Sequence, residues 1–456
     1  MLEVINRFAK LNLELKDFVA IIRGLNEIGY QSVIWQSKIN MLATAGITKL
    51  DNDILEWIGY YNLRESNSFI YRGDLFVDNK DVIYLINQSN NFLNTERKIE
   101  IGIITEDPQS ANAKLGKFAK AFIKVLTTKI DGRRTRHMDL KWYIFNSNDQ
   151  LDAQVSFYKS FTYPILSDIE SEASLCLIDQ DKRQVMRRLS EAGSMKQLDI
   201  ENKNAKGHLD TIQGLITQNL VITKYIVTCR KKSLPIGVIE SPNELINQSN
   251  HGLSCPHCGQ SFGKELLNKS YALSELGKKM LQSSHWMTLL VTKILIEQGI
   301  PEKCIIWNLT DAAEEVDCAV QFKDKVWIFE LKDRDFEAGD AHPLLYRAIK
   351  FKANKTVIIT TGRVSKDARK IFEDLSLQKS SGFRNGHPLY IEGLSTLKTA
   401  ISTLIKNETL LHVLNKSKEI SHASMTDFSI IFSKLFGKYI IEHKGKFTND
   451  TISRHF

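Results

Sequence analysis

The stretch Glu314-Glu-Val-Asp-Cys-Ala-Val-Gln-Phe-Lys-Asp-Lys-Val-Trp-Ile-Phe-Glu-Leu-Lys332 decides how the C-terminal half of this chain folds. Apolar residues alternate along its first part, and its second part is an apolar run that ends in charge. The pattern predicts two antiparallel strands joined by a turn at Lys323-Asp-Lys325. Because side chains at positions i and i+2 of a strand share a face, we expect Glu330 and Lys332 to project together.

Pairing across this hairpin can bring Asp317 to the same edge as Glu330 and Lys332. Two carboxylates placed there can hold a hard divalent cation such as Mg²⁺ or Mn²⁺. The ammonium group beside them can orient the attacking water or help to deprotonate it. These three residues are therefore our candidates for the catalytic residues of a phosphodiester hydrolase.

The motif resembles that of the PD-(D/E)XK restriction-endonuclease-like superfamily, in which an Asp is followed after a short interval by Glu-x-Lys. The similarity covers about 283–374, where we expect a helix at 286–299, the hairpin, a helix at 343–353, a strand at 356–361 and a helix at 365–374, with a further strand at 389–391. The resemblance implies an α/β nuclease core at 283–394 that requires Mg²⁺ or Mn²⁺. Many members carry a Glu early in the first helix, where this chain has His285-Trp-Met-Thr-Leu. Glu314 or Glu315 is the candidate for that additional carboxylate.

The segment 176–230 has the pattern of a winged helix-turn-helix, with helices expected at 181–192 and 204–218 and a strand at 220–227. In such domains the second helix lies in the major groove, so Lys203, Lys206, His208 and Gln213 would face DNA. Winged helices also serve as spacers between proteins, and that alternative stays open. Arg347 and Lys355 are candidates for contacts with the phosphodiester backbone, and the alternative for them is a solvated helix face.

The six cysteines are too sparse for a disulfide framework. Cys255-Pro-His-Cys258 has the spacing of a zinc knuckle, and it defines a zinc-ribbon-like segment at 231–282. Cys229 is followed by Arg-Lys-Lys where a partner cysteine would stand. Cys229 together with His251 or His257 could complete a structural Zn²⁺ site. The alternative is a ribbon that folds without metal.

The sequence of the two ends of the chain, residues 1–175 and 395–456, contains no motif that indicates a catalytic or binding function. Residues 1–175 predict an α/β domain with a helix at 13–28 and strands at 81–86, 99–104 and 140–145, the last two joined by a helix as one strand-helix-strand unit. It has no glycine pattern that would bind phosphate. Residues 395–456 predict a helical extension that covers the nuclease core or forms a subunit interface.

The composition is that of an ordinary globular protein, with 456 residues, 43% of them hydrophobic and 25% charged. The formal charge of +8 suits a polyanionic partner. The apolar runs are far shorter than the roughly 20 residues needed to cross a bilayer, and we expect no membrane span. The N-terminus shows no export signal, which indicates a cytoplasmic protein.

Together these features predict an α/β multidomain protein that acts as a metal-dependent endonuclease on DNA, with RNA not excluded. The resemblance further implies a role in restriction or phage defence. The alternatives are a nuclease fold kept as a non-catalytic scaffold that binds nucleic acid, or a regulator built around the winged helix. We also expect that a homodimer forms, because two sites cut a duplex most easily, or that a partner protein such as an ATPase takes part.

Overall fold

The structure is a computed structural model of the whole chain, and it describes residues 2–11, 13, 15–44, 72–88, 98–130, 142, 160–197, 206–311, 314–323, 325–377, 387–424, 431–432 and 434–437. The chain is a mixed α/β protein that divides into two compact units. Among the described residues, no helix is both long enough and apolar enough to cross a bilayer.

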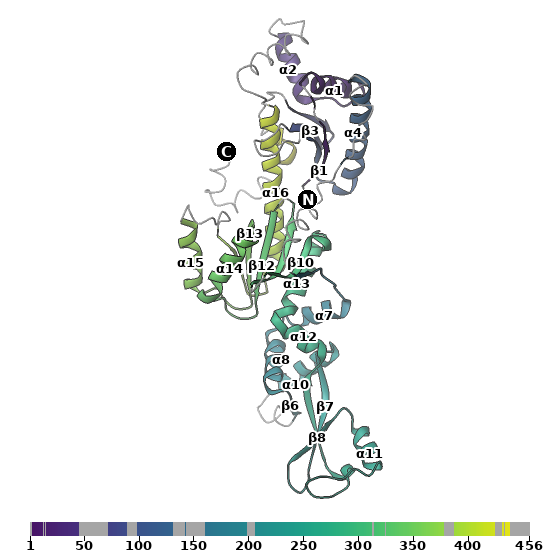
Figure 1. Cartoon of the computed structure of the whole chain (residues 1–456), viewed down its shortest axis with the longest axis vertical. Coiled ribbons are helices and arrows are strands. Elements are labelled where there is room, and N and C mark those ends of the chain that lie inside the picture. The colour runs from purple at the N-terminus through teal and green to yellow at the C-terminus, as the bar shows by residue number, and fades with distance from the viewer. Residues whose placement is uncertain are drawn as a thin grey trace. The chain divides into compact units, whose positions relative to one another are not determined.

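The first unit comprises residues 1–146 and 402–456, and its described part is built on a four-stranded antiparallel sheet in the order β1-β4-β3-β2 (Figure 1). The elements are β1 (Glu3–Lys10), α1 (Leu15–Glu27), α2 (Val33–Thr44), β2 (Gly73–Asp78), β3 (Asp81–Gln88), β4 (Lys98–Thr105), α4 (Pro108–Lys129) and the part of α16 (Leu397–Ser424) from residue 402 onwards. Helix α4 begins where the side chain of Asp107 accepts a hydrogen bond from the amide of Ser110. The strand predicted at 140–145 lies outside the described residues, apart from the single residue Trp142.

From residue 402 onwards helix α16 belongs to the core of this first unit, whereas the sequence predicted that the tail covers the nuclease core or forms a subunit interface. Val413, Ile420 and Ala423 are buried in the same cluster as the strands of the N-terminal sheet. Lys416 lies 2.9 Å from the fully buried carboxylate of Glu100. The apolar stripe explained why the helix is buried, but it did not say against what.

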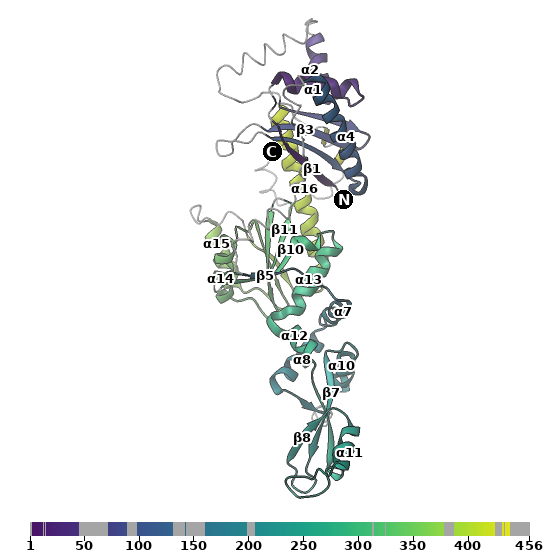
Figure 2. The same ribbon diagram turned by 45° about the vertical axis from the view of Figure 1, so that its right-hand side comes forward.

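The second unit, residues 147–401, contains a six-stranded sheet in the order β14-β13-β12-β11-β10-β5. The elements are β5 (Ser160–Thr162), α13 (His285–Glu297), β10 (Ile305–Asp311), β11 (Glu314–Phe322), β12 (Lys325–Lys332), α14 (Ala338–Lys350), β13 (Lys355–Thr360), α15 (Lys366–Leu377) and β14 (Leu389–Glu392). Neighbours from β10 to β12 pair antiparallel, and neighbours from β12 to β14 pair parallel. Figures 1 and 2 show α13 on one face of this sheet and α14 with α15 on the other.

The helices and strands predicted between 286 and 391 are confirmed, with boundaries that differ by at most five residues. Helix α14 begins at Ala338 rather than at residue 343, so that Pro343 lies inside it. The earlier start follows from a capping box, in which Glu337 and Asp340 each accept a hydrogen bond from the other's backbone amide. Only residues 333–337 therefore lie between β12 and α14.

A second, four-stranded sheet in this unit has the order β6-β9-β7-β8. The elements around it are α7 (Asp168–Cys176), α8 (Gln180–Ala192), β6 (Met195–Lys196), α10 (Lys206–Thr217), β7 (Val221–Thr228), β8 (Pro235–Ile239), α11 (Pro242–Asn250), β9 (Leu266–Leu273) and α12 (Glu275–Leu281). Helix α8 ends at Ala192, the predicted residue, and Gly193 follows it with a φ of 72°. Because β9 lies between β6 and β7, a domain boundary at residue 230 would divide one sheet. The cysteine-bearing segment is instead an insertion between β7 and β9.

Candidate active site

Strand β12 carries the Glu-x-Lys motif at its C-terminal end, where the sequence placed it. Ile328 is part of the apolar core between the sheet and α14, and alternation along the strand puts Glu330 and Lys332 on that same face. The ammonium of Lys332 lies 2.9 Å from Oε1 of Glu330. The strand thus presents one buried carboxylate and one cation side by side.

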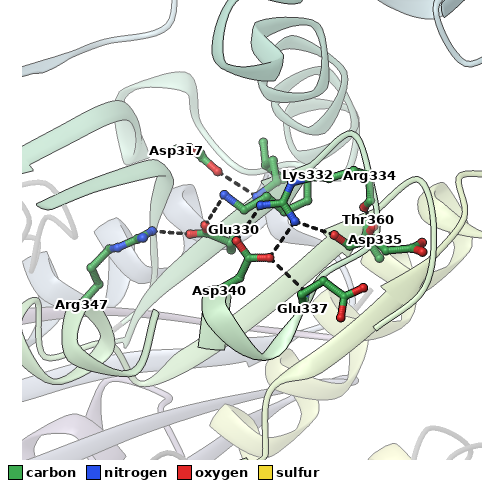
Figure 3. Close-up of polar contacts among 10 residues, drawn as sticks. Asp317, Glu330, Lys332, Arg334, Asp335, Glu337, Asp340, Arg347 and Thr360 are labelled. Atoms are coloured by element: carbon green, nitrogen blue, oxygen red, sulfur yellow. Dashed lines mark hydrogen bonds and ion pairs between the residues drawn. The ribbon is translucent and has the colours of Figure 1, made fainter. Parts of the chain in front are cut away.

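Asp317 of β11 joins this pair from the neighbouring strand (Figure 3). Its Oδ2 accepts a hydrogen bond of 2.8 Å from the backbone amide of Leu331, the residue between Glu330 and Lys332. The register pairs Cys318 with Phe329, so that Asp317 stands next to Glu330 across the two strands. The structure therefore brings Asp317, Glu330 and Lys332 together at one edge of the hairpin.

The pKa of Asp317 is raised to about 7. Burial is the largest cause, and the negative charge of Glu330 adds to it, while the Leu331 amide and the cations of Lys332 and Arg347 oppose it. Two neighbouring buried carboxylates repel each other, and a divalent cation between them would relieve that repulsion. Oxygen donors of this kind fit Mg²⁺ or Mn²⁺.

Arg347 of α14 completes the surroundings of Glu330. Its Nη1 lies 2.5 Å from Oε2 of Glu330, whose side chain is only 2% exposed. Lys332 and Arg347 therefore each hold one oxygen of the same carboxylate (Figure 3). The sequence predicted a contact of Arg347 with the phosphodiester backbone, whereas the structure places its guanidinium on the carboxylate of Glu330.

These side chains line a cleft of about 630 Å³. Of the lining side chains that the structure describes, five are acidic and four are basic. The acidic ones are Glu191, Glu315, Asp317, Glu330 and Asp333, and the basic ones are Arg187, Lys332, Arg334 and Arg347. An excess of acidic groups disfavours a phosphodiester, and one bound divalent cation would reverse the balance.

The remaining predicted residues lie differently with respect to this cleft. Glu315 lines it with an exposed side chain, while the side chain of Glu314 lies outside the described part of the chain. Lys355 begins β13 opposite Trp327, whereas Ile358 is the residue opposite Glu330, so Lys355 lies at the other end of the strand pair. Lys203 and the side chain of Lys206 fall outside the described residues.

Several other residues that line the cleft were not predicted from the sequence. Arg334 makes two hydrogen bonds, of 2.7 and 2.8 Å, to the carboxylate of Asp340, which itself caps α14. Asp333 pairs with Arg187 of α8 at 2.6 Å. Asp333 and Arg334 directly follow the Glu-x-Lys motif, which was the available signal for them. Arg187 lies on α8, far from the motif in the sequence, and no sequence signal identified it as a lining residue.

The insertion between β7 and β9 brings Cys229, Cys255, Cys258 and Glu265 together, with one ligand atom of each within 4.8 Å of the others. This cluster could hold a metal ion. The fourth group is a glutamate, whereas the sequence predicted a histidine. His251 Nδ1 contacts the carbonyl of Asn247 at 2.7 Å, and His257 is exposed.

The turns in this cluster explain the exchange of the fourth ligand. The amide of Gly259 donates to the carbonyl of Cys255 at 2.8 Å, and the amide of Ser233 donates to the carbonyl of Cys229 at 2.7 Å. The turns that begin at Cys255 and at Cys229 are thus closed by the same hydrogen bond. The first turn carries its second thiol at Cys258, whereas the other has Lys232 at the equivalent position. Glu265, the residue directly before β9, supplies the missing donor.

No protein-family model matches the chain, and no curated protein matches it.

Proposed function

We propose that the chain is a metal-dependent nuclease that hydrolyses phosphodiester bonds, with DNA as its substrate. The observation that carries this proposal is the meeting of Asp317, Glu330 and Lys332 in one cleft. Charged groups at the end of a buried strand cost stability, because each must be desolvated. Their presence there therefore favours a functional role. The order of helices and strands around the motif supports the resemblance to PD-(D/E)XK nucleases.

Each residue has a distinct task in this proposal. Asp317 and Glu330 would hold Mg²⁺ or Mn²⁺, which when bound polarises the phosphate and activates water. Lys332 lies where its ammonium can orient that water and take part in its deprotonation. Arg347 neutralises the second oxygen of Glu330 and keeps this carboxylate in place.

DNA as the substrate is supported by two features. The chain carries a formal charge of +8, which favours polyanions. The middle module (residues 168–281, from α7 to α12) has a sheet in which β9 lies between β6 and β7, and α8 and α10 precede β7. This order resembles that of winged helices that bind DNA.

The test is to incubate the purified chain with plasmid, linear duplex, single-stranded DNA and RNA, each with Mg²⁺, Mn²⁺ or excess EDTA. We expect cleavage of DNA that EDTA abolishes and that Glu330→Gln abolishes. Cleavage of RNA alone would correct the substrate. Tight binding without cleavage on every substrate would contradict the nuclease and favour a scaffold or a winged-helix regulator.

We also propose that the ion held by Cys229, Cys255, Cys258 and Glu265 is a structural Zn²⁺. Zinc prefers tetrahedral sites of four donors, and thiolates two residues apart on a tight turn are common in them. The insertion between β7 and β9 has a small core of four buried side chains, Val227, Ile239, Leu245 and Phe262. A bound metal ion would stabilise the folded insertion, because so small a core contributes little stability.

Zinc content measured by mass spectrometry of the purified chain tests this site. We expect about one zinc per chain for the wild type and its loss in Cys258→Ser. Cys176→Ser is the matched control, because Cys176 lies on α7 outside the cluster. A wild-type protein that stays free of zinc after growth with added zinc would contradict the proposal.

A further inference from the structure

Helix α8 of the middle module forms part of the candidate active site. Arg187, Ser190 and Glu191 line the cleft together with Asp317, Glu330 and Lys332. Positions i, i+3 and i+4 share one face of a helix, so this side of α8 faces the cleft. The sequence placed nucleic-acid contacts of this module on the following helix, α10.

Two arginines of α8 attach this helix to the end of β12. Arg183 Nε lies 3.2 Å from Oδ1 of Asp333, and Arg187 Nη2 lies 2.6 Å from Oδ2 of the same carboxylate. Asp333 directly follows Lys332. The side chains of Asp333 and Arg183 are only 10% and 8% exposed, so this ion pair is a fixed part of the unit.

The two arginines differ in what else they can do. Arg183 also donates to the carbonyls of Leu177 and Ile178 at 2.7 Å, and its guanidinium lies 5.3 Å from the ring centroid of Trp286. Both hydrogens of its Nη1 are used within the protein, and its Nε faces Asp333. The side chain of Arg187 is 44% exposed and lies in the cleft.

We propose that Arg187 binds a backbone phosphate of the nucleic-acid strand in the cleft, next to the phosphodiester group at Asp317 and Glu330. A guanidinium has five donors, and a carboxylate partner orients it while leaving others to face solvent. Asp333 holds Arg187 in place, and Arg183 shares the neutralisation of that carboxylate. This inference rests on the proposed nuclease function. It assigns to α8 a direct part in binding the substrate.

The test measures binding apart from cleavage, by fluorescence anisotropy of a short labelled DNA duplex and of its single strand in Ca²⁺ over a series of salt concentrations. For Arg187→Ala we expect an affinity about tenfold weaker. The salt slope, which is the slope of log affinity against log salt concentration, should be smaller in magnitude by about 1, because one phosphate contact is lost. Arg188→Ala is the matched control, because Arg188 is the neighbouring exposed arginine of α8 and does not line the cleft. It should keep the wild-type affinity and slope.

Arg187→Gln covers the case in which the alanine variant fails to fold, because an amide can still donate to Asp333. It should lower the salt slope as much as alanine does, with unchanged affinity for Mn²⁺ measured by calorimetry. A purely structural role predicts the opposite result, a lower unfolding temperature with the wild-type slope, and would overturn the inference.

The outcomes separate this inference from the proposed function. If the wild type binds and cleaves DNA and both Arg187 variants bind as it does, only the role of Arg187 is wrong. If the wild type binds without cleaving and Arg187→Ala lowers the slope, the role of Arg187 stands and the nuclease proposal fails. A wild type that binds no nucleic acid overturns both.

Discussion

Replacing Arg347 by methionine should destabilise the metal-free protein by about 3 kcal/mol, the lower end of the range for breaking a buried ion pair. The Arg347 and Glu330 side chains are 14% and 2% exposed, and their charged groups lie 2.5 Å apart. Loss of the arginine leaves a buried carboxylate with one cation, Lys332, at 2.9 Å. For a domain of this size the loss corresponds to a fall in unfolding temperature of about 6 to 12 °C.

Saturating Mg²⁺ should restore most of the lost stability of Arg347→Met. A cation bound by Glu330 replaces the missing charge and stabilises the folded state by mass action. The assay is scanning calorimetry of wild type and variant in EDTA and in excess Mg²⁺. Lys398→Met is the control, since Lys398 pairs with Glu297 at 2.8 Å with side chains 67% and 39% exposed. Such a pair contributes less than about 1 kcal/mol. The reasoning is refuted if Arg347→Met loses no more stability than Lys398→Met. It is also refuted if Mg²⁺ raises the unfolding temperatures of the wild type and of Arg347→Met equally.

Three further predictions concern the metal sites and the middle module. Because Asp317 has a pKa of about 7 and must lose its proton to bind a cation, the affinity for Mn²⁺ measured by calorimetry should rise about tenfold per pH unit below about pH 7 and level off above it; an affinity that does not change with pH would contradict this. Gly277→Ala should cost about 1 to 3 kcal/mol in urea unfolding, because its Cβ would collide with the backbone carbonyl of Leu220, whereas Gly339→Ala meets open space and should not. Chelation of the zinc proposed at the cysteine cluster should increase amide hydrogen exchange across β8 and α11, and protection that stays unchanged would show that the insertion folds without the ion.

The local parts of the site could be predicted from the sequence because their determinants lie close together in the chain. Alternation along Val326 to Lys332 determines which side chains share a face, and the short turn determines that β11 pairs with β12. The positions of Glu330 and Lys332 follow from those two facts. Asp317 then has no other place than the neighbouring strand.

Long-range partners could not be predicted in the same way. Nothing in the local pattern near Asp333 indicates that Arg183 and Arg187 of α8 neutralise it, since that contact depends on how two modules pack. Glu265 likewise follows Cys258 without any ligand spacing that would identify it. The partner of α16 stayed open for the same reason, because an apolar stripe of a helix is compatible with any apolar surface.

The comparison of Lys332→Ala with Lys325→Ala tests the central claim most directly. Both lysines belong to β12, but Lys332 ends the strand beside Glu330 and Lys325 begins it opposite Phe322. Initial rates of DNA cleavage in Mg²⁺ should fall about a thousandfold for Lys332→Ala, within the range expected for a group that assists proton transfer, and stay at the wild-type rate for Lys325→Ala. Cleavage by Lys332→Ala at the wild-type rate would show that Asp317, Glu330 and Lys332 are not the nuclease site.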